Sequence, residues 1–110
     1  MHTLLLLANL LWPVTGPVTQ YPSARHPAVD VACLPGSPVR AAHGGTVRTR
    51  WSHDLGNVVE VESETYRSLY AHLNSVERVK EAKQGDTLGT CGNTGRLSTG
   101  PHLHLEVTLK

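Results

Sequence analysis

The chain has 110 residues, with ten Lys and Arg against nine Asp and Glu, which gives a formal net charge of +1. This length fits one domain, and the near-neutral charge excludes a nucleic-acid binder that relies on a basic patch. The hydrophobic residues make up 39% and the charged residues 17%, too few charges for a solvated disordered chain. Seven histidines are unusual in so short a domain and suggest metal binding or acid–base chemistry.

Residues 1–11 form a short apolar segment that is similar to the hydrophobic core of a signal peptide. No Lys or Arg precedes the apolar run that begins at Leu4, and no small-residue cleavage site follows it. A first buried strand or a truncated start therefore explains the segment better than a signal peptide does. The segment is far too short to cross a bilayer, and no other stretch is long and apolar enough. We therefore expect no membrane span.

Cys33 and Cys91 are the only cysteines, and neither belongs to a Cys-x-x-Cys pair of the kind found in zinc knuckles or redox motifs. Two interpretations stay open. The cysteines are two buried thiols that pack as small hydrophobic residues, or they form one disulfide if the protein works outside the cytoplasm.

From Pro38 onward, short runs of alternating apolar residues are separated by Gly-rich turns, which is typical of strands. The candidate strands are 39–42, 46–51, 57–62, 65–70, 86–91 and 102–109. The first two flank a His-Gly-Gly turn and predict a hairpin, whereas 76–83 is a weak helix candidate. The predicted fold is all-β, a mainly antiparallel sheet or rolled β-sandwich with Gly-rich loops and little or no helix.

The segment His102–Val107 (HLHLEV) carries the strongest local signal. On a strand, its leucines and valine would face the core while His102, His104 and Glu106 would line the opposite face. The two histidines would then be about 7 Å apart at their Cα atoms, close enough to share one small site. One metal ion could bind both histidines, or one histidine could be a ligand while the other transfers protons. The alternative is a polar outer face that happens to hold two histidines.

A second cluster, His26–Val31 (HPAVDV), predicts a loop histidine followed by a strand. Pro27 and the β-branched valines oppose a helix here, so Asp30 would face away from the core. His72 lies near the end of a predicted strand, where a lone histidine is more often structural. Three further histidines are expected to be solvated and without a role: His2, His43 and His53.

Two histidines and one aspartate from these clusters would supply the three N/O ligands of a catalytic zinc with an open fourth position. Such a zinc makes peptide hydrolysis feasible near neutral pH. No His-Glu-x-x-His helix is present, so the general base would be a histidine or Glu106.

Several motifs in order then resemble the lysostaphin-type zinc metallopeptidases of bacterial cell walls, over nearly the whole chain from Trp12 to Val107. The matching segments are WPVTG at 12–16, similar to the entry strand of that family, HPAVDVA at 26–32, PVRAAHGGTV at 38–47, LGNVV at 55–59, LYAHL at 69–73, QGD at 84–86, GNTG at 92–95 and STGPHLHLE at 98–106. The resemblance implies a single metallopeptidase domain over 12–110, after the apolar segment 1–11.

The resemblance also implies a site. His26, Asp30 and His104 would bind one zinc ion, while His72 and His102 would flank the attacking water as general base and stabiliser of the developing oxyanion. The implied activity is endopeptidase cleavage of peptide bridges or stems in peptidoglycan, by a monomer that is extracellular, periplasmic or in the cell wall. It requires no nucleic-acid partner.

Two other functions compete with this one. A non-catalytic cell-wall-binding or hydrolase-activator module could keep the same fold. A zinc or copper storage site, suggested by the number of histidines alone, would have no need of His72.

Overall fold

The structure is a computed structural model that describes residues 10–23 and 28–110. These residues form strands, turns and loops, and within them no helix is long and apolar enough to cross a membrane. The strands of this described part are β1 (Val18–Gln20), β2 (Val29–Ala32), β3 (Pro38–Arg40), β4 (Gly45–Ser52), β5 (Gly56–Glu62), β6 (Tyr66–Leu73), β7 (Glu81–Ala82), β8 (Thr87–Thr90) and β9 (His102–Leu109).

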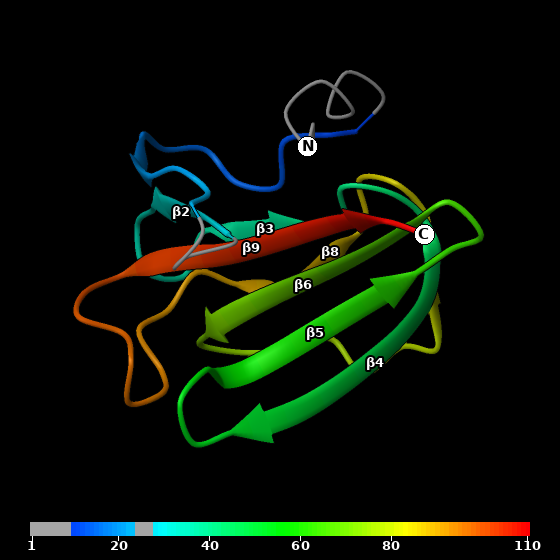
Figure 1. Ribbon diagram of the computed structural model, residues 1–110. Coiled ribbons are helices and arrows are strands. Elements are labelled where there is room, and N and C mark those ends of the chain that lie inside the picture. Colours follow the sequence, from blue (N-terminus) through cyan, green and yellow to red (C-terminus); the bar gives the residue numbers. More distant parts are fainter. Residues whose placement is uncertain (1–9, 24–27) are drawn as a thin grey trace.

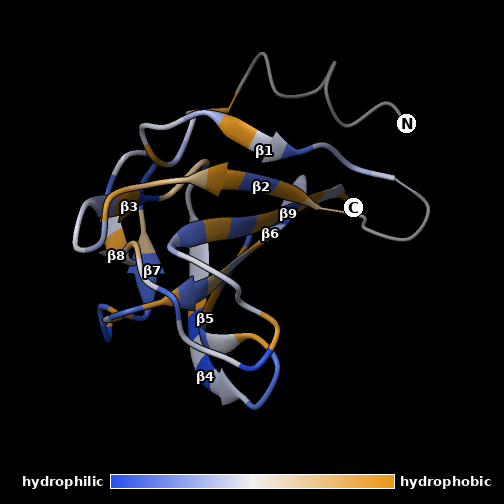
Figure 2. Cartoon of the chain, turned by 90° about the vertical axis from the view of Figure 1, so that its left-hand side faces the viewer, coloured by the Kyte–Doolittle hydropathy of each residue, from blue (hydrophilic) through white to orange (hydrophobic). Residues whose placement is uncertain are grey.

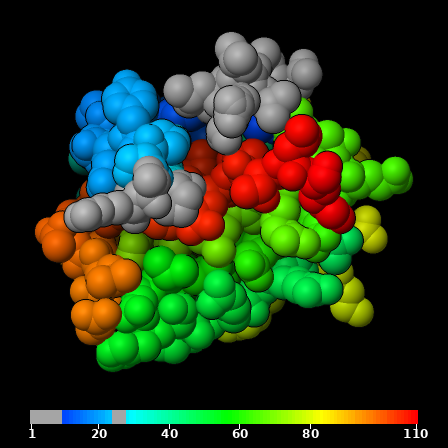
Figure 3. All heavy atoms as spheres, viewed as in Figure 1, coloured from blue at the N-terminus to red at the C-terminus, as the bar shows by residue number. Residues whose placement is uncertain are grey.

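The strands form two antiparallel sheets (Figure 1). The large sheet has the order β1-β2-β9-β6-β5-β4-β7, and β3 pairs with β8 in the small one. The small sheet lies behind one face of the large sheet, as the turned view also shows (Figure 2). The opposite, outer face of the large sheet is the one seen in Figure 3. Over residues 10–23 and 28–110, the predicted all-β antiparallel fold with little or no helix is confirmed.

The core lies between the two sheets because the central strands alternate as predicted. On β9, Leu103 and Leu105 are buried while the alternating residues His102, His104 and Glu106 are only partly covered. On β2, Val29 and Val31 are buried and Asp30 is not. Val39 and Leu88 close the core from the small sheet, and both are fully buried. Alternation therefore turns the polar residues of β2 and β9 to the outer face.

Three local predictions are wrong. The runs 39–42 and 46–51 do not form a hairpin, because β3 pairs with β8 while β4 pairs with β5 and β7. Residues 76–83 contain no helix; Val76 makes an isolated bridge and Ala82 belongs to β7. The expected entry strand at 12–16 is irregular, and the first strand of the described part begins at Val18. Most of the apolar segment 1–11 lies outside the described residues.

The structure resolves the two interpretations of the cysteines in favour of a disulfide. Cys33 and Cys91 are bonded across a sequence separation of 58 residues. Cys33 directly follows β2 and Cys91 directly follows β8, so the bond ties the large sheet to the segment that leads towards β9. The disulfide is thus one covalent link between the two layers.

We expect removal of this disulfide to lower the free energy of unfolding by about 4 kcal/mol, the loop-entropy value for a loop of this length. The measurement is denaturant unfolding of the Cys33→Ala/Cys91→Ala protein against the oxidised wild type. Reduction should shift the wild type in the same direction and leave the double variant unchanged. A double variant within 1 kcal/mol of the wild type would contradict this expectation.

His43 is not in a solvated turn, and this expectation is wrong. It is 6% exposed, its Nδ1 lies 2.8 Å from the Gly44 carbonyl, and its Nε2 lies 2.8 Å from Oγ of Ser68. Ser68 in turn donates to the hydroxyl of Tyr70, which accepts the N–H of Ala42. A Ser–His pair could be a nucleophile and its base, but Ser68 is 1% exposed and no substrate reaches it. The network is structural.

Burial raises the pKa of Tyr70, against the opposing effect of its hydrogen bonds. A phenol whose pKa is higher in the folded than in the unfolded protein stabilises the fold fully below the unfolded pKa, near 10, and loses this contribution as the pH rises. We expect the stability gap between wild type and Tyr70→Phe to narrow above about pH 10, by up to about 1.4 kcal/mol per pH unit. Urea unfolding of both proteins at a series of alkaline pH values measures it, and a constant gap would contradict it.

Candidate metal and catalytic site

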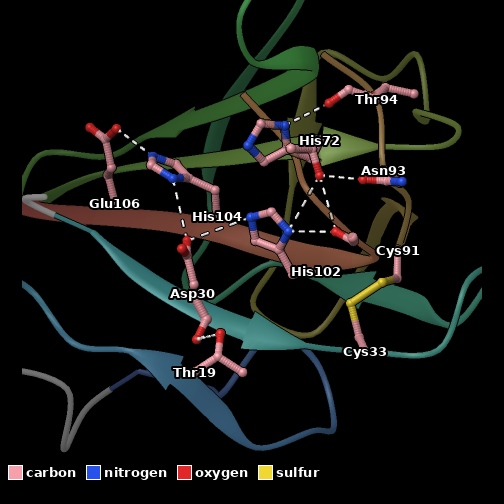
Figure 4. Close-up of polar contacts among 12 residues, drawn as sticks. Thr19, Asp30, Cys33, His72, Cys91, Asn93, Thr94, His102, His104 and Glu106 are labelled. Carbon is pink, nitrogen blue, oxygen red and sulfur yellow. Dashed lines mark hydrogen bonds and ion pairs between the residues drawn. A yellow bond between two sulfur atoms is a disulfide. The ribbon is translucent and has the colours of Figure 1, made fainter. Parts of the chain in front are cut away.

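Asp30 on β2 and His104 on β9 are directly paired neighbours in the register of the large sheet, and Ala32 pairs with His102 in the same way. Directly paired residues share a face, so the carboxylate and both imidazoles meet on the outer face. Asp30 Oδ1 lies 3.4 Å from Nδ1 of His104 and 3.8 Å from Nε2 of His102. Figure 4 shows the two rings directed at this one oxygen. Sequence analysis predicted that these residues face away from the core, and the structure confirms it.

His72 joins the cluster from β6 through a local irregularity of the backbone. Strict alternation would turn it to the core, because its neighbour Ala71 pairs with His104 and shares the outer face. Between the pairs Asn57↔Leu73 and Val59↔Tyr70, however, β6 has one more residue than β5. His72 also has a φ of 64°, in the left-handed region that side chains with a Cβ rarely occupy. Such a bulge re-aims a side chain, and the strain it carries is typical of functional positions.

The three imidazole rings are close together. The ring centroid of His72 lies 4.8 Å from that of His102 and 5.8 Å from that of His104. His72 is 2% exposed, and the side chains of His102, His104 and Asp30 are between 13% and 16% exposed. This is a recessed polar cluster, reached from the outer face of the sheet.

Each ring has one nitrogen against an oxygen at the edge of the cluster. His72 Nδ1 donates to the carbonyl of Thr94 at 2.6 Å, and His102 Nδ1 donates to the carbonyl of Gly100 at 2.7 Å. Nε2 of His104 lies 2.9 Å from a carboxylate oxygen of Glu106. In a neutral imidazole only one nitrogen carries a hydrogen, so Nε2 of His72 and of His102 keep their lone pairs. Nδ1 of His104 and the Asp30 carboxylate, 3.4 Å apart, are N and O donors of the kind that a divalent cation such as zinc takes.

Burial lowers the pKa of His72, an effect that its hydrogen bond to Thr94 only partly offsets. The neighbouring His102 and His104 lower the pKa further. His72 is therefore neutral at neutral pH, with Nε2 able to accept a proton. A neutral imidazole of this kind can serve as a general base, with geometry deciding which proton it reaches.

Of the predicted site residues, the structure brings together Asp30, His72, His102 and His104. His26 lies outside the described residues. Within 10–23 and 28–110, no three ligating side chains are arranged around one ion position, and this part of the chain lacks the third expected ligand. Glu106 lies at the edge of the cluster beside His104, and His53 is exposed as expected.

Sequence analysis missed the residues that hold the rings. Thr94 is fixed by its own side chain, which donates to the Leu73 carbonyl and accepts from the N–H of Asn57. A Cβ at Gly56 would overlap Thr94, so this close approach requires glycine, which also has a φ of 70°. Ser98 lies 3.4 Å from Nδ1 of His102. Backbone carbonyls as ring partners give no residue-type signal, but the Gly-rich spacing of 92–100 marks the loop that supplies them.

A groove of about 740 Å³ lies farther along the large sheet, and residues of its outer face line it. Glu60 pairs with Leu69, which pairs with Glu106, so the groove wall and the cluster share one face. Both charge signs line it, and Glu62 forms ion pairs with Arg67 and Lys110. A polar segment in this groove would lie on the same surface as the histidines.

Comparison with known proteins gives a consistent family match. The sequence profile described as "Peptidase family M23" matches residues 24–110. The chain is 40% identical over 100 residues to peptidoglycan DD-endopeptidase ShyC of Vibrio cholerae. This alignment covers 87% of the chain and 22% of ShyC. It is 36% identical over 87 residues to DD-carboxypeptidase/endopeptidase Mpg of Neisseria meningitidis, covering 76% of this chain and 20% of that one. The chain thus spans about a fifth of the curated relatives it matches.

Solved structures agree. A zinc-containing peptidase from Vibrio cholerae superposes with a TM-score of 0.79 at 30% identity, over 89% of this chain and 36% of that one. The catalytic domain of lysostaphin from Staphylococcus simulans superposes with a TM-score of 0.70 at 30% identity. In that case the match covers 99% of this chain and 87% of the lysostaphin domain. The lysostaphin match therefore extends over nearly all of both chains.

Proposed function

The chain belongs to peptidase family M23, and we propose that it acts as a zinc metalloendopeptidase that hydrolyses peptide cross-links or bridges of bacterial peptidoglycan. The observation that carries this proposal is the meeting of Asp30, His72, His102 and His104 on one face, with Nδ1 of His72 and of His102 bonded to backbone carbonyls. The match over 24–110 and the names of the relatives support it. We propose that 12–110 is a single catalytic domain.

The zinc ligands would be His26, Asp30 and His104. Asp30 and His104 fit this role because Oδ1 and Nδ1 are 3.4 Å apart on neighbouring strands. His26 is the ligand expected from the sequence motif. A zinc ion bound by such a set polarises a carbonyl group and lowers the pKa of water to near neutrality.

His72 and His102 would do the proton transfers. Their Nδ1 atoms donate to the Thr94 and Gly100 carbonyls, so Nε2 of either ring can accept a proton from the attacking water. The resulting imidazolium then donates that proton to the leaving amine as the peptide bond breaks. A protonated ring beside the reacting carbonyl also stabilises negative charge that develops on its oxygen.

The substrate we propose is a peptide of peptidoglycan, as the names of the relatives suggest. The polar groove along the outer face would accept part of it. A peptidoglycan substrate places the protein in the periplasm, the cell wall or the extracellular space. The Cys33–Cys91 disulfide supports this location, because such bonds persist in oxidising compartments and are rare in the cytosol.

A zymogram tests the proposal against the activator module. Purified cell walls are cast in a gel, and the protein is renatured in parallel lanes with zinc or with a chelator. A metallopeptidase gives a clear band with zinc and none with the chelator. A non-catalytic activator gives no band in either lane, and this outcome would overturn the proposal.

A further inference from the structure

Glu106 follows His104 by two residues on β9, so both side chains lie on the outer face. Its Oε2 lies 2.9 Å from Nε2 of His104, and its side chain is 35% exposed against 13% for His104. Figure 4 shows the imidazole of His104 between two carboxylates, with Glu106 on one side and Asp30 on the other. The two carboxylates face different nitrogens of the same ring.

This placement determines where the hydrogen of the ring lies. An ionised carboxylate accepts hydrogen bonds and cannot donate them, so Nε2 of His104 must carry the hydrogen to bind Glu106. A neutral imidazole then has its lone pair on Nδ1. Nδ1 lies 3.4 Å from Oδ1 of Asp30, beyond the usual N–H···O range of about 2.7–3.2 Å, whereas the 2.9 Å contact with Glu106 lies within it. Glu106 therefore turns the basic nitrogen of His104 towards the oxygen of the proposed zinc ligand.

His72 and His102 are held differently. Their outer nitrogens donate to backbone carbonyls, which are neutral acceptors. Within 10–23 and 28–110, His104 is the one ring of the three in the cluster that has a glutamate partner. A carboxylate partner fixes the tautomer and also raises the basicity of the ring as a metal ligand. The ring that we assign as a zinc ligand thus has a charged partner. The two rings that we assign to proton transfer have neutral partners.

We infer that Glu106 is a positioning residue that locks His104 in the Nε2–H tautomer and presents Nδ1 to the metal. It acts through His104 and is not the general base, which remains with His72 and His102. This inference rests on the proposed function, because it takes His104 as a zinc ligand.

The first test measures zinc affinity by competition with a fluorescent zinc indicator. It compares the wild type with Glu106→Ala, Glu106→Gln and the control Glu77→Gln, which removes an exposed carboxylate outside the groove and the histidine cluster. Loss of a partner of this kind typically weakens metal binding about 10–100-fold, and we expect this for Glu106→Ala. Glu106→Gln should be intermediate, because its amide oxygen can still accept from Nε2. Glu77→Gln should match the wild type.

The second test needs no zinc. Long-range ¹H–¹⁵N NMR of the metal-free protein reports which nitrogen of His104 carries the hydrogen. We expect the Nε2–H tautomer in the wild type and in Glu106→Gln, and a mixture of tautomers in Glu106→Ala.

The outcomes separate the two claims. A wild type that does not bind zinc would contradict the proposed function, while the NMR spectra still test the role of Glu106. A wild type that binds zinc, with Glu106→Ala within twofold of its affinity, would overturn the inference alone. The Nδ1–H tautomer of His104 in the wild type would also overturn it.

Discussion

Asp30→Ala should lose both zinc and peptidoglycan hydrolysis. Asp30 supplies the carboxylate of the proposed ligand set, with Oδ1 at 3.4 Å from Nδ1 of His104. Loss of an outer partner costs about 10–100-fold in metal affinity, so loss of a ligand should cost more than about 100-fold. Hydrolysis should then fall to the level of the chelated wild type. Metal analysis after gel filtration and release of soluble fragments from purified cell walls measure the two effects.

The matched control is Glu77→Ala, which removes an exposed carboxylate. The backbone N–H of Glu77 donates to the Leu88 carbonyl in the small sheet, and this bond does not depend on the side chain. It should retain full zinc and full activity. The fold should survive Asp30→Ala, since Val29 and Val31 carry the core contacts of β2. Full zinc and full lytic activity in Asp30→Ala would show that the assignment is wrong.

His102→Ala should separate binding from catalysis. We expect it to keep its zinc and to lose about 10²–10⁴-fold in kcat, the usual contribution of a general acid or base. The reason is that Nδ1 of His102 is held by Gly100 while Nε2 faces Asp30. Steady-state kinetics on soluble cross-linked muropeptides, together with zinc content, distinguish this outcome from loss of the metal.

His72→Asn tests the second ring by the same measurements, and asparagine tolerates the positive φ of this position better than alanine does. The control is His53→Ala, because His53 is exposed and outside the cluster. Loss of zinc in His102→Ala, or unchanged turnover with zinc retained, would contradict the division of roles.

Much of the site follows from period-two alternation. The pattern in 102–107 and in 29–31 predicts which side chains face outward, and direct pairing of β2 with β9 then brings Asp30 and His104 together. The pairing itself is not local, but the order of motifs that resemble the metallopeptidase family anticipates it. These strands needed no irregular backbone, which is why simple alternation was enough.

His72 and His43 show where alternation fails. His72 points to the outer face through a bulge and a left-handed backbone, and neither has a signal in the residues 69–73. His43 is buried because Ser68 and Tyr70, far away in sequence, supply polar partners inside the fold. In both cases tertiary contacts decide the orientation of the side chain.

The wrong hairpin and the wrong helix have a related cause. Alternation in 39–42 and 46–51 predicts strands correctly, yet it does not say which strands pair, and β3 finds its partner in β8. In 76–83 the apolar spacing of three does not mark a helix face, because Val76 and Ala82 form separate bridges with Gly89 and Gly45 and Val79 is 43% exposed. Local periodicity is therefore a guide to strands and a poor guide to their partners.

The most direct test of the account is mass spectrometry of fragments released from defined cross-linked muropeptides. The protein is used zinc-loaded, chelator-treated and zinc-restored. The account predicts cleavage of one peptide bond with addition of one water and intact glycan, lost with the chelator and recovered with zinc. Absence of any cleaved peptide with zinc present, or the same fragments with and without the chelator, would contradict it.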